Sequence, residues 1–265
     1  MCRLAGYVGH RPTALASLLY DPPHSLEHAA YAPRELLYGT VNVDGTGVVW
    51  WTDSDAAPLS YVTDKPPWAD PNLPGLAPKL EGRTVLATVR SATPGLAFGP
   101  ANVAPFVSGN VAAVHNGWIG GFRGAVGRRL LQRLSDERHA DLLAMNDSLA
   151  LFLLVLQHLE DEPEATVPDA VSATIELVAD EVDRAGEAAT LNLVVGSASE
   201  IVAARTSAGA PVNSLYVRRT EDASWVASEP LDPDDAWEAV PEHSLVTLTA
   251  EGITMRSMEH QGVRS

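Results

Sequence analysis

The C-terminal part of the chain is a succession of short apolar segments, and this pattern restricts the fold more than any other feature. Six segments follow one another, LNLVVGS, EIVAAR, SLYVRR, ASWVAS, SLVTLT and GITMRS, beginning at residues 191, 200, 214, 223, 244 and 252. Short apolar runs that alternate with turn residues are typical of β-strands. We therefore predict that this part of the chain consists of strands.

Helices precede these strands. Residues 147–159 and 168–184 carry apolar side chains at helical spacing, and Asn146 is suited to cap the first of them. A shorter helix is predicted over residues 123–134, after a glycine-rich stretch.

The N-terminal part returns to strands. We predict strands over residues 2–9 and 83–89, and a pair over residues 103–107 and 110–114. In the segment 40–51, Asp44-Gly45 indicates a turn that leads into a further strand. The order of strands, helices and strands predicts an α+β fold whose two helices are covered or flanked by sheets.

Two segments are predicted to be less regular. Residues 12–19 suggest a short helix that ends before Asp21-Pro22-Pro23. The proline-rich residues 64–79 suggest a surface loop with little regular structure, long enough to be a binding loop or a lid.

The charge of the chain excludes several kinds of partner. Its 265 residues carry a formal net charge of −16, which repels phosphates, so we expect no nucleic acid and no anionic membrane as a partner. The longest apolar run, residues 149–156, is too short to span a bilayer, and no signal peptide is visible. The single cysteine can form no intrachain disulfide, which suits a cytoplasmic location.

That cysteine, Cys2, lies where removal of Met1 would expose it as the first residue. A thiol needs a base to become a good nucleophile, and a free α-amino group, with a pKa of roughly 7.7–8.0 in model peptides, is a suitable one. The alternative is that Cys2 is a small buried apolar residue.

Other residues have the chemistry that cleavage of a γ-glutamyl amide requires. Asn116 and Gly117 follow a predicted strand and would stabilise an oxyanion through a side-chain amide and a backbone N–H. Arg90 is suited to bind the glutamyl carboxylate, Thr93 to add a hydrogen bond, and Asp147 to hold the ammonium group. There are also structural alternatives. Asn116-Gly117 could be a plain Asn-Gly turn, Arg90 could form a surface ion pair, and Asp147 could cap a helix.

Several motifs together carry a resemblance to a known family. They are MCRLAGYVG, DPPHSL, NVDGTGVVWW, TVRSATPG, HNGWI, NDSLAL, LNLVVG and the late ASEPLD stretch, and they extend over nearly the full length. With them the chain resembles the class II glutamine amidotransferases, a family of N-terminal-nucleophile (Ntn) hydrolases. It is most similar to the members that hydrolyse γ-glutamyl hercynylcysteine S-oxide in ergothioneine biosynthesis.

The resemblance implies a four-layer αββα sandwich and a single domain over residues 2–265. It implies Cys2 as nucleophile, Asn116 and Gly117 as oxyanion donors, and Arg90, Thr93 and Asp147 as glutamyl-binding residues. The implied substrate is a small γ-glutamyl compound, and neither a metal nor an organic cofactor is needed. One departure is Thr88, which stands where many amidotransferases of this class carry a histidine two residues before the arginine.

The implied substrate also carries a trimethylammonium group, which suits an aromatic face. Trp118, next to the oxyanion motif, is the first candidate for this contact, ahead of Trp68 and Phe98, although core or loop packing is the favoured role of all three.

Alternatives remain open at this point. The chain could hydrolyse another γ-glutamyl compound, act as the glutaminase subunit of an amidotransferase, or be an inactive binding protein with the same fold. The sequence does not decide whether it forms a homo-oligomer. His24 and His28 are spaced like metal ligands, but no third ligand is suitably placed, so a metal site is not expected.

Overall fold

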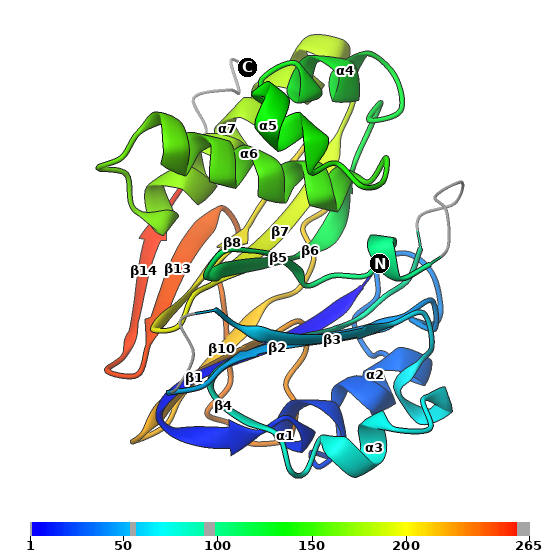
Figure 1. Cartoon of the computed structure of the whole chain (residues 1–265), viewed down its shortest axis with the longest axis vertical. Helices are drawn as coiled ribbons and strands as arrows, with labels where there is room; N and C mark the ends of the chain where they lie inside the picture. Colours follow the sequence, from blue (N-terminus) through cyan, green and yellow to red (C-terminus); the bar gives the residue numbers. More distant parts are fainter. Residues whose placement is uncertain (1, 54–56, 93–98, 259–265) are drawn as a thin grey trace.

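Two β-sheets packed face to face form the centre of the computed structural model, which describes residues 2–53, 57–92 and 99–258 (Figure 1). In spatial order the first sheet contains β12 (Glu238–Ala239), β10 (Tyr216–Arg219), β11 (Ala223–Ala227), β1 (Arg3–Ala14), β4 (Glu81–Val89), β2 (Thr46–Trp51) and β3 (Leu59–Thr63). The second contains β14 (Ile253–Ser257), β13 (Ser244–Thr249), β8 (Glu200–Arg205), β7 (Ala189–Gly196), β6 (Val111–Ile119) and β5 (Phe106–Ser108), with β9 (Ser207–Ala208) beside β7. The neighbouring strands run antiparallel in both sheets.

Helices cover the outer face of each sheet. The first sheet is covered by α1 (Ala16–Leu19), α2 (Leu26–Tyr31), the short 3₁₀ turn η1 (Pro67–Ala69) and α3 (Leu73–Leu76), near the bottom of Figure 1. The second is covered by α4 (Ala125–Leu131), α5 (Asp136–Ala140), α6 (Asp147–Asp161) and α7 (Val167–Ala185). A further 3₁₀ turn, η2 (Pro100–Asn102), precedes β5. The predicted α+β, four-layer αββα fold is confirmed.

The two long helices begin at the residues that their sequences favour. The side chain of Asn146 accepts hydrogen bonds from the backbone N–H groups of Ser148 and Leu149, which confirms it as the cap of α6. In α7, Thr166 and Asp169 form a reciprocal capping box. Both helices therefore start at a fixed residue, and this fixes Asp147 in the first turn of α6.

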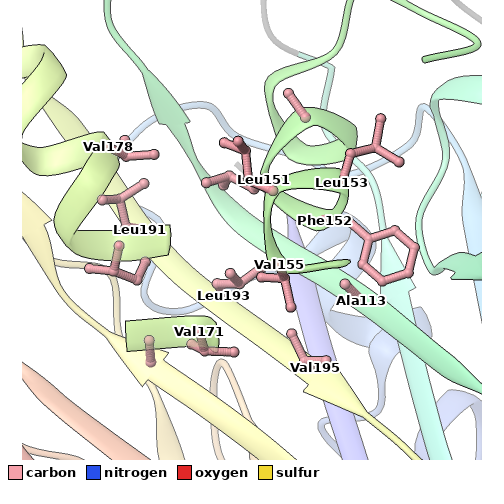
Figure 2. Close-up of a cluster of buried hydrophobic side chains, with 14 of the residues drawn as sticks. Ala113, Leu151, Phe152, Leu153, Val155, Val171, Val178, Leu191, Leu193 and Val195 are labelled. Carbon is pink, nitrogen blue, oxygen red and sulfur yellow. The ribbon is translucent and has the colours of Figure 1, made fainter. Parts of the chain in front are cut away.

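Apolar side chains fill all three spaces between the layers. Leu4, Val49 and Val194 belong to the core between the two sheets. A larger core lies between the second sheet and its helices, where Phe152 of α6 packs among side chains from β6, β7 and α7 (Figure 2). We call α4, α6, α7 and the sheet face beneath them the helical layer.

Several local predictions are wrong. Asn116 and Gly117 do not follow a strand but lie within β6, which continues to Ile119. The first strand does not end at Gly9 but continues to Ala14, because β1 pairs with β4 again at Thr13 and Ala14 after an irregular stretch. The predicted helix over residues 12–19 is therefore reduced to α1. Residues 64–79 are not an irregular loop but hold η1 and α3. At the start of α3, the Asp70 carboxylate accepts hydrogen bonds from the backbone N–H groups of Asn72 and Leu73.

Candidate active site

Cys2 lies directly before β1 at one end of the sandwich and is half-buried. Its Sγ is 3.9 Å from the carbonyl oxygen of Ser91. The antiparallel register of β1 and β4 pairs Arg3 with Val89, so Cys2 and the residues that follow β4 meet at the same edge. Met1 lies outside the described residues.

A pocket opens beside Cys2 and brings together four of the predicted site residues: Cys2, Arg90, Gly117 and Asp147 line it. In chain order they lie directly before β1, directly after β4, within β6 and at the start of α6. The other lining residues are Thr88, Ser91, Asn102, Ala104, Phe106, His115, Asn146 and Ser148.

Arg90 is held by the turn that the sequence predicts at Asp44-Gly45. Its backbone N–H donates to the carbonyl oxygen of Gly45 at 2.8 Å, and its carbonyl accepts from the N–H of Asp44 at 3.0 Å. Gly45 has φ +149°, and a Cβ there would lie 2.5 Å from Cγ2 of Val103. Glycine is thus required in the turn that positions the buried arginine.

Asp147 is a buried carboxylate at the N-terminus of α6, 6% exposed. One carboxylate oxygen accepts a hydrogen bond from the backbone N–H of Ile119 at 3.1 Å, and the other accepts from the N–H of Ser148 at 2.8 Å. The bond from Ile119 joins α6 to the end of β6. The two bonds hold a negative charge at the pocket wall, where a ligand ammonium group would be stabilised.

His115 is a pocket residue that sequence reasoning missed. Its Nδ1 lies 2.9 Å from Oγ of Ser148, and its Nε2 lies 3.1 Å from the carbonyl oxygen of Thr190. A carbonyl only accepts, so Nε2 carries the proton and donates. Burial lowers the pKa of His115, although the charge of Asp147 acts in the opposite direction. The available signal was its position two residues before Gly117, because alternate strand residues share a face.

Gly117 lies where the chain tolerates no side chain. A Cβ at this position would lie 1.8 Å from the carbonyl oxygen of Thr190 and 2.5 Å from Nε2 of His115. Its backbone therefore lies closer to Thr190 and His115 than that of any other residue type could.

Asn116 is fully buried and is not among the residues that line the pocket. Its Nδ2 donates a long hydrogen bond, 3.5 Å, to Oγ of Ser228. Because Oγ of Ser228 also accepts from the backbone N–H of Leu4 at 3.1 Å, this hydroxyl joins Asn116 to the strand that carries Cys2. We call this end of the sandwich, which holds Cys2, Arg90 and Asn116, the Cys2 end.

Two of the three aromatic candidates for contact with a trimethylammonium group, Trp118 and Trp68, are among the described residues. Trp118 is half-buried and does not line the pocket. Trp68 is 44% exposed and packs edge-to-face against Tyr31, with 5.6 Å between ring centroids. Thr93 and Phe98 lie outside the described residues.

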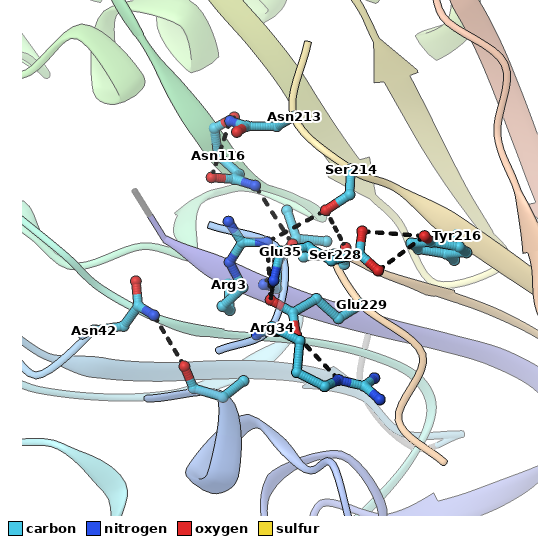
Figure 3. Close-up of polar contacts among 12 residues, drawn as sticks. Arg3, Arg34, Glu35, Asn42, Asn116, Asn213, Ser214, Tyr216, Ser228 and Glu229 are labelled. Atoms are coloured by element: carbon cyan, nitrogen blue, oxygen red, sulfur yellow. Dashed lines mark hydrogen bonds and ion pairs between the residues drawn. The ribbon is translucent and has the colours of Figure 1, made fainter. Parts of the chain in front are cut away.

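A second feature that sequence reasoning missed is a buried ion pair next to Cys2. Nη1 of Arg3 lies 3.3 Å from Oε1 of Glu229, and the two side chains are 1% and 5% exposed (Figure 3). Burial lowers the pKa of Arg3, and the charge of Glu229 opposes this effect. Glu229 follows β11, which pairs with β1, so the sheet register brings the two residues together.

The described residues hold no group of three or more His, Cys, Asp and Glu side chains that could bind a metal ion. The His24 and His28 rings lie 5.8 Å apart, and Nη1 of Arg34 lies 3.5 Å from Nε2 of His24. In the same ranges, no helix is long and apolar enough to cross a membrane.

Comparison with known proteins gives relatives along nearly the whole chain, although no family model matches it. A gamma-glutamyl-hercynylcysteine sulfoxide hydrolase of Mycobacterium tuberculosis is 31% identical over 259 residues, which cover 98% of this chain and 97% of the relative. The protein of the same name from Mycolicibacterium smegmatis is 33% identical over 248 residues, covering 94% and 96%.

Solved structures agree on the fold. A glutamine aminotransferase class-II domain protein from Silicibacter pomeroyi superimposes with a TM-score of 0.71 at 25% identity, over 97% of this chain and 99% of the other. The glutamine phosphoribosylpyrophosphate amidotransferase of B. subtilis gives a TM-score of 0.67 at 18% identity, over 97% of this chain and 49% of the other.

Proposed function

The chain belongs to the family of gamma-glutamyl-hercynylcysteine sulfoxide hydrolases, and we propose that it cleaves the γ-glutamyl amide of γ-glutamyl hercynylcysteine S-oxide, releasing glutamate and hercynylcysteine S-oxide in ergothioneine biosynthesis. One observation carries the proposal. A thiol, a guanidinium and a carboxylate from separate parts of the chain, those of Cys2, Arg90 and Asp147, line one pocket.

In the proposed mechanism, removal of Met1 makes Cys2 the first residue. Its free α-amino group accepts the thiol proton, and the thiolate attacks the γ-carbonyl carbon of the substrate. This base lies on the same residue as the nucleophile, so the reaction requires no histidine at the position of Thr88. Instead, the hydroxyl of Thr88 donates a hydrogen bond to the carbonyl oxygen of Arg3 at 2.9 Å.

The glutamyl half of the substrate has one carboxylate and one ammonium group to be recognised. We assign the carboxylate to Arg90, whose guanidinium can bind it through two parallel hydrogen bonds, and the ammonium to Asp147. Both side chains are at least nine-tenths buried, at 5% and 6% exposure, so their charges act in a medium of low dielectric. Thr93 and Trp118 remain candidates for further substrate contacts.

Attack by the thiolate produces an oxyanion, which Asn116 and Gly117 would stabilise through an amide and a backbone N–H. The intermediate then collapses, the C–N bond breaks, and the α-ammonium group of Cys2 returns its proton to the leaving amine. Water adds to the resulting γ-glutamyl thioester and releases glutamate, which restores the thiol. Every group that reacts in these steps comes from the chain, the substrate or water.

The decisive experiment combines an intact mass with a substrate panel. Protein with a native N-terminus is weighed, and glutamate release is measured from γ-glutamyl hercynylcysteine S-oxide, glutamine and glutathione. Loss of Met1 with a strong preference for the sulfoxide is expected. A preference for glutamine would instead indicate a glutaminase subunit, whereas retention of Met1 with no glutamate from any compound would favour a binding protein.

The proposal extends to the domain organisation, the cellular compartment and the partners of the chain. We propose that residues 2–265 form a single class II glutamine amidotransferase-type domain and that the reaction takes place in the cytoplasm, where a single catalytic thiol stays reduced. We further propose that no nucleic acid is a partner, because the net charge of −16 opposes it.

A further inference from the structure

A group of buried polar residues at the Cys2 end leaves two hydrogen-bond donors of Arg3 without an acceptor in the described part of the chain. The residues concerned are Arg3, Asn116, Ser214, Ser228 and Glu229, which we call the Arg3 cluster (Figure 3). Arg3 follows Cys2 directly, so their Cα atoms are about 3.8 Å apart. A guanidinium buried beside a nucleophile is costly unless its N–H groups find acceptors.

The guanidinium of Arg3 uses only part of its hydrogen-bonding capacity. Nη1 lies 3.3 Å from Oε1 of Glu229 and donates a long bond, 3.4 Å, to Oγ of Ser214. Nε and Nη2 are buried and have no hydrogen-bond partner among the described residues. Two charged donors at the Cys2 end therefore lack an acceptor.

The acceptors of the cluster are already engaged elsewhere. The Glu229 carboxylate accepts the backbone N–H groups of Arg34 and Glu35, at 2.9 and 3.1 Å. The carbonyl oxygen of Ser228 accepts the hydroxyl of Ser214 at 2.7 Å, and Oγ of Ser228 is shared between Leu4 and Asn116. The two Arg3 nitrogens without a partner fit an anionic group supplied by a ligand.

The substrate class itself carries such a group close to the bond that breaks. In a γ-glutamyl amide of an α-amino acid, the scissile nitrogen is bonded to the carbon that bears the carboxylate of the leaving group. That carboxylate must lie close to the carbon that Cys2 attacks. The amide of glutamine releases ammonia and has no such carboxylate.

We propose that Arg3 binds the carboxylate of the leaving amino acid and thereby selects γ-glutamyl amides of α-amino acids over those without this carboxylate. This inference rests on the proposed function and extends it to the other half of the substrate. Each of the two substrate carboxylates then has its own arginine: Arg90 binds the glutamyl carboxylate and Arg3 binds the carboxylate of the leaving group.

The test uses two substrates that differ only in this carboxylate, γ-glutamylglycine and γ-glutamylmethylamide. We expect wild-type kcat/KM to favour γ-glutamylglycine by at least about 30-fold. Arg3→Gln should lower kcat/KM for γ-glutamylglycine by about 30-fold and leave that for the methylamide within about threefold. Arg3→Lys, which keeps the charge without the planar fork, should recover part of the preference.

Arg34→Gln is the matched control, because Nε of Arg34 lies 3.6 Å from Oε2 of Glu229 but its side chain is 40% exposed. Arg34→Gln should leave the preference for γ-glutamylglycine over γ-glutamylmethylamide unchanged. Equal wild-type rates on the two substrates would overturn the role of Arg3 while leaving the hydrolase reaction in place. An equal loss on both substrates in folded Arg3→Gln would show a structural role only. No glutamate from either substrate, and none from γ-glutamyl hercynylcysteine S-oxide assayed beside them, would overturn the proposed function as well.

Discussion

Two buried glutamates pair with arginines in opposite ways. Glu181 of α7 is 2% exposed and forms ion pairs with Arg129, Arg133 and Arg184, whose side chains are 29%, 59% and 61% exposed. Glu229 is buried to a similar degree, but Arg3, which pairs with it, is buried too. In the first site the acid is surrounded by arginines that solvent also reaches, whereas in the second the arginine itself is enclosed.

The difference separates a structural ion pair from a functional one. The arginines around Glu181 are exposed enough for solvent to reach their remaining N–H groups, so this site needs no ligand. The N–H groups of Arg3 that lack a partner have no such access, and Arg3 directly follows Cys2 in the chain. Buried polar groups are costly to keep, and they are common where a protein must recognise or transform a ligand. We therefore propose that the Cys2 end binds the substrate and that the helical layer provides stability.

The largest expected effect is that of Cys2→Ala. It should reduce glutamate release by at least about 10⁴-fold, because the nucleophile is lost. The free energy of unfolding should change by less than about 1 kcal/mol, because the side chain is small and half-buried. Steady-state assays and urea unfolding measure the two quantities. A large loss of stability, or retained turnover, would contradict the division between the two regions.

Phe152→Ala is expected to have the reverse effect. Phe152 is 1% exposed in the core of the helical layer, and its truncation should cost about 3–5 kcal/mol of unfolding free energy. The ratio of rates on γ-glutamylglycine and γ-glutamylmethylamide should not change in the fraction that remains folded. Leu143→Ala, at a site that is 79% exposed, is the control and should stay within about 0.5 kcal/mol of wild type. If Phe152→Ala altered the ratio, the helical layer would not be merely a scaffold.

The sequence predicted these two regions unequally. Local signals such as the Asn146 cap and the short apolar runs were sufficient for α6 and for most strands. The helix α2, with Ser25 as its cap, was not predicted, because it has only six residues after two prolines. Cys2, Arg90, Gly117 and Asp147 were predicted from their chemistry, and the structure places them around one pocket.

The Arg3 cluster could not be predicted in this way. Arg3 and Glu229 lie at opposite ends of the chain, and only the pairing of β1 with β11 brings them together. An arginine in an apolar strand is visible in the sequence, but its partner is fixed by sheet register, which is not a local property. The same holds for His115, whose contact with Ser148 depends on how α6 packs against β6.

Glu181→Gln tests the structural ion pair with a smaller effect. Removing its charge should cost about 1–2 kcal/mol, below the value for a fully enclosed pair, because its arginines reach solvent. Hydrogen bonding to Arg129 lowers the pKa of Glu181, so its contribution is present above the ordinary glutamate value of 4.5 and is lost as the pH falls through the lowered value. Glu176→Gln, on an exposed part of α7, is the matched control in urea unfolding. A change in preference for the leaving-group carboxylate would remove the distinction between the two glutamates.

The smallest expected effect is a pH dependence of stability caused by His115. This residue lies where the two regions meet, because it belongs to β6, lines the pocket and contacts Ser148 of α6. Burial lowers the pKa of His115 in the folded state below the ordinary value of 6.5. Just below pH 6.5, His115 therefore binds a proton in the unfolded chain but not in the folded chain. Stability should therefore fall as the pH decreases from about 6.5 toward the lowered pKa, by at most about 1.4 kcal/mol per pH unit. His115→Asn should remove this slope, and His139→Asn, at an exposed position of α5, should keep it. Urea unfolding between about pH 7.5 and about pH 5.5, one unit either side of the ordinary value, measures the slope. A slope that survives in His115→Asn would mean that another group couples the helical layer to the Cys2 end.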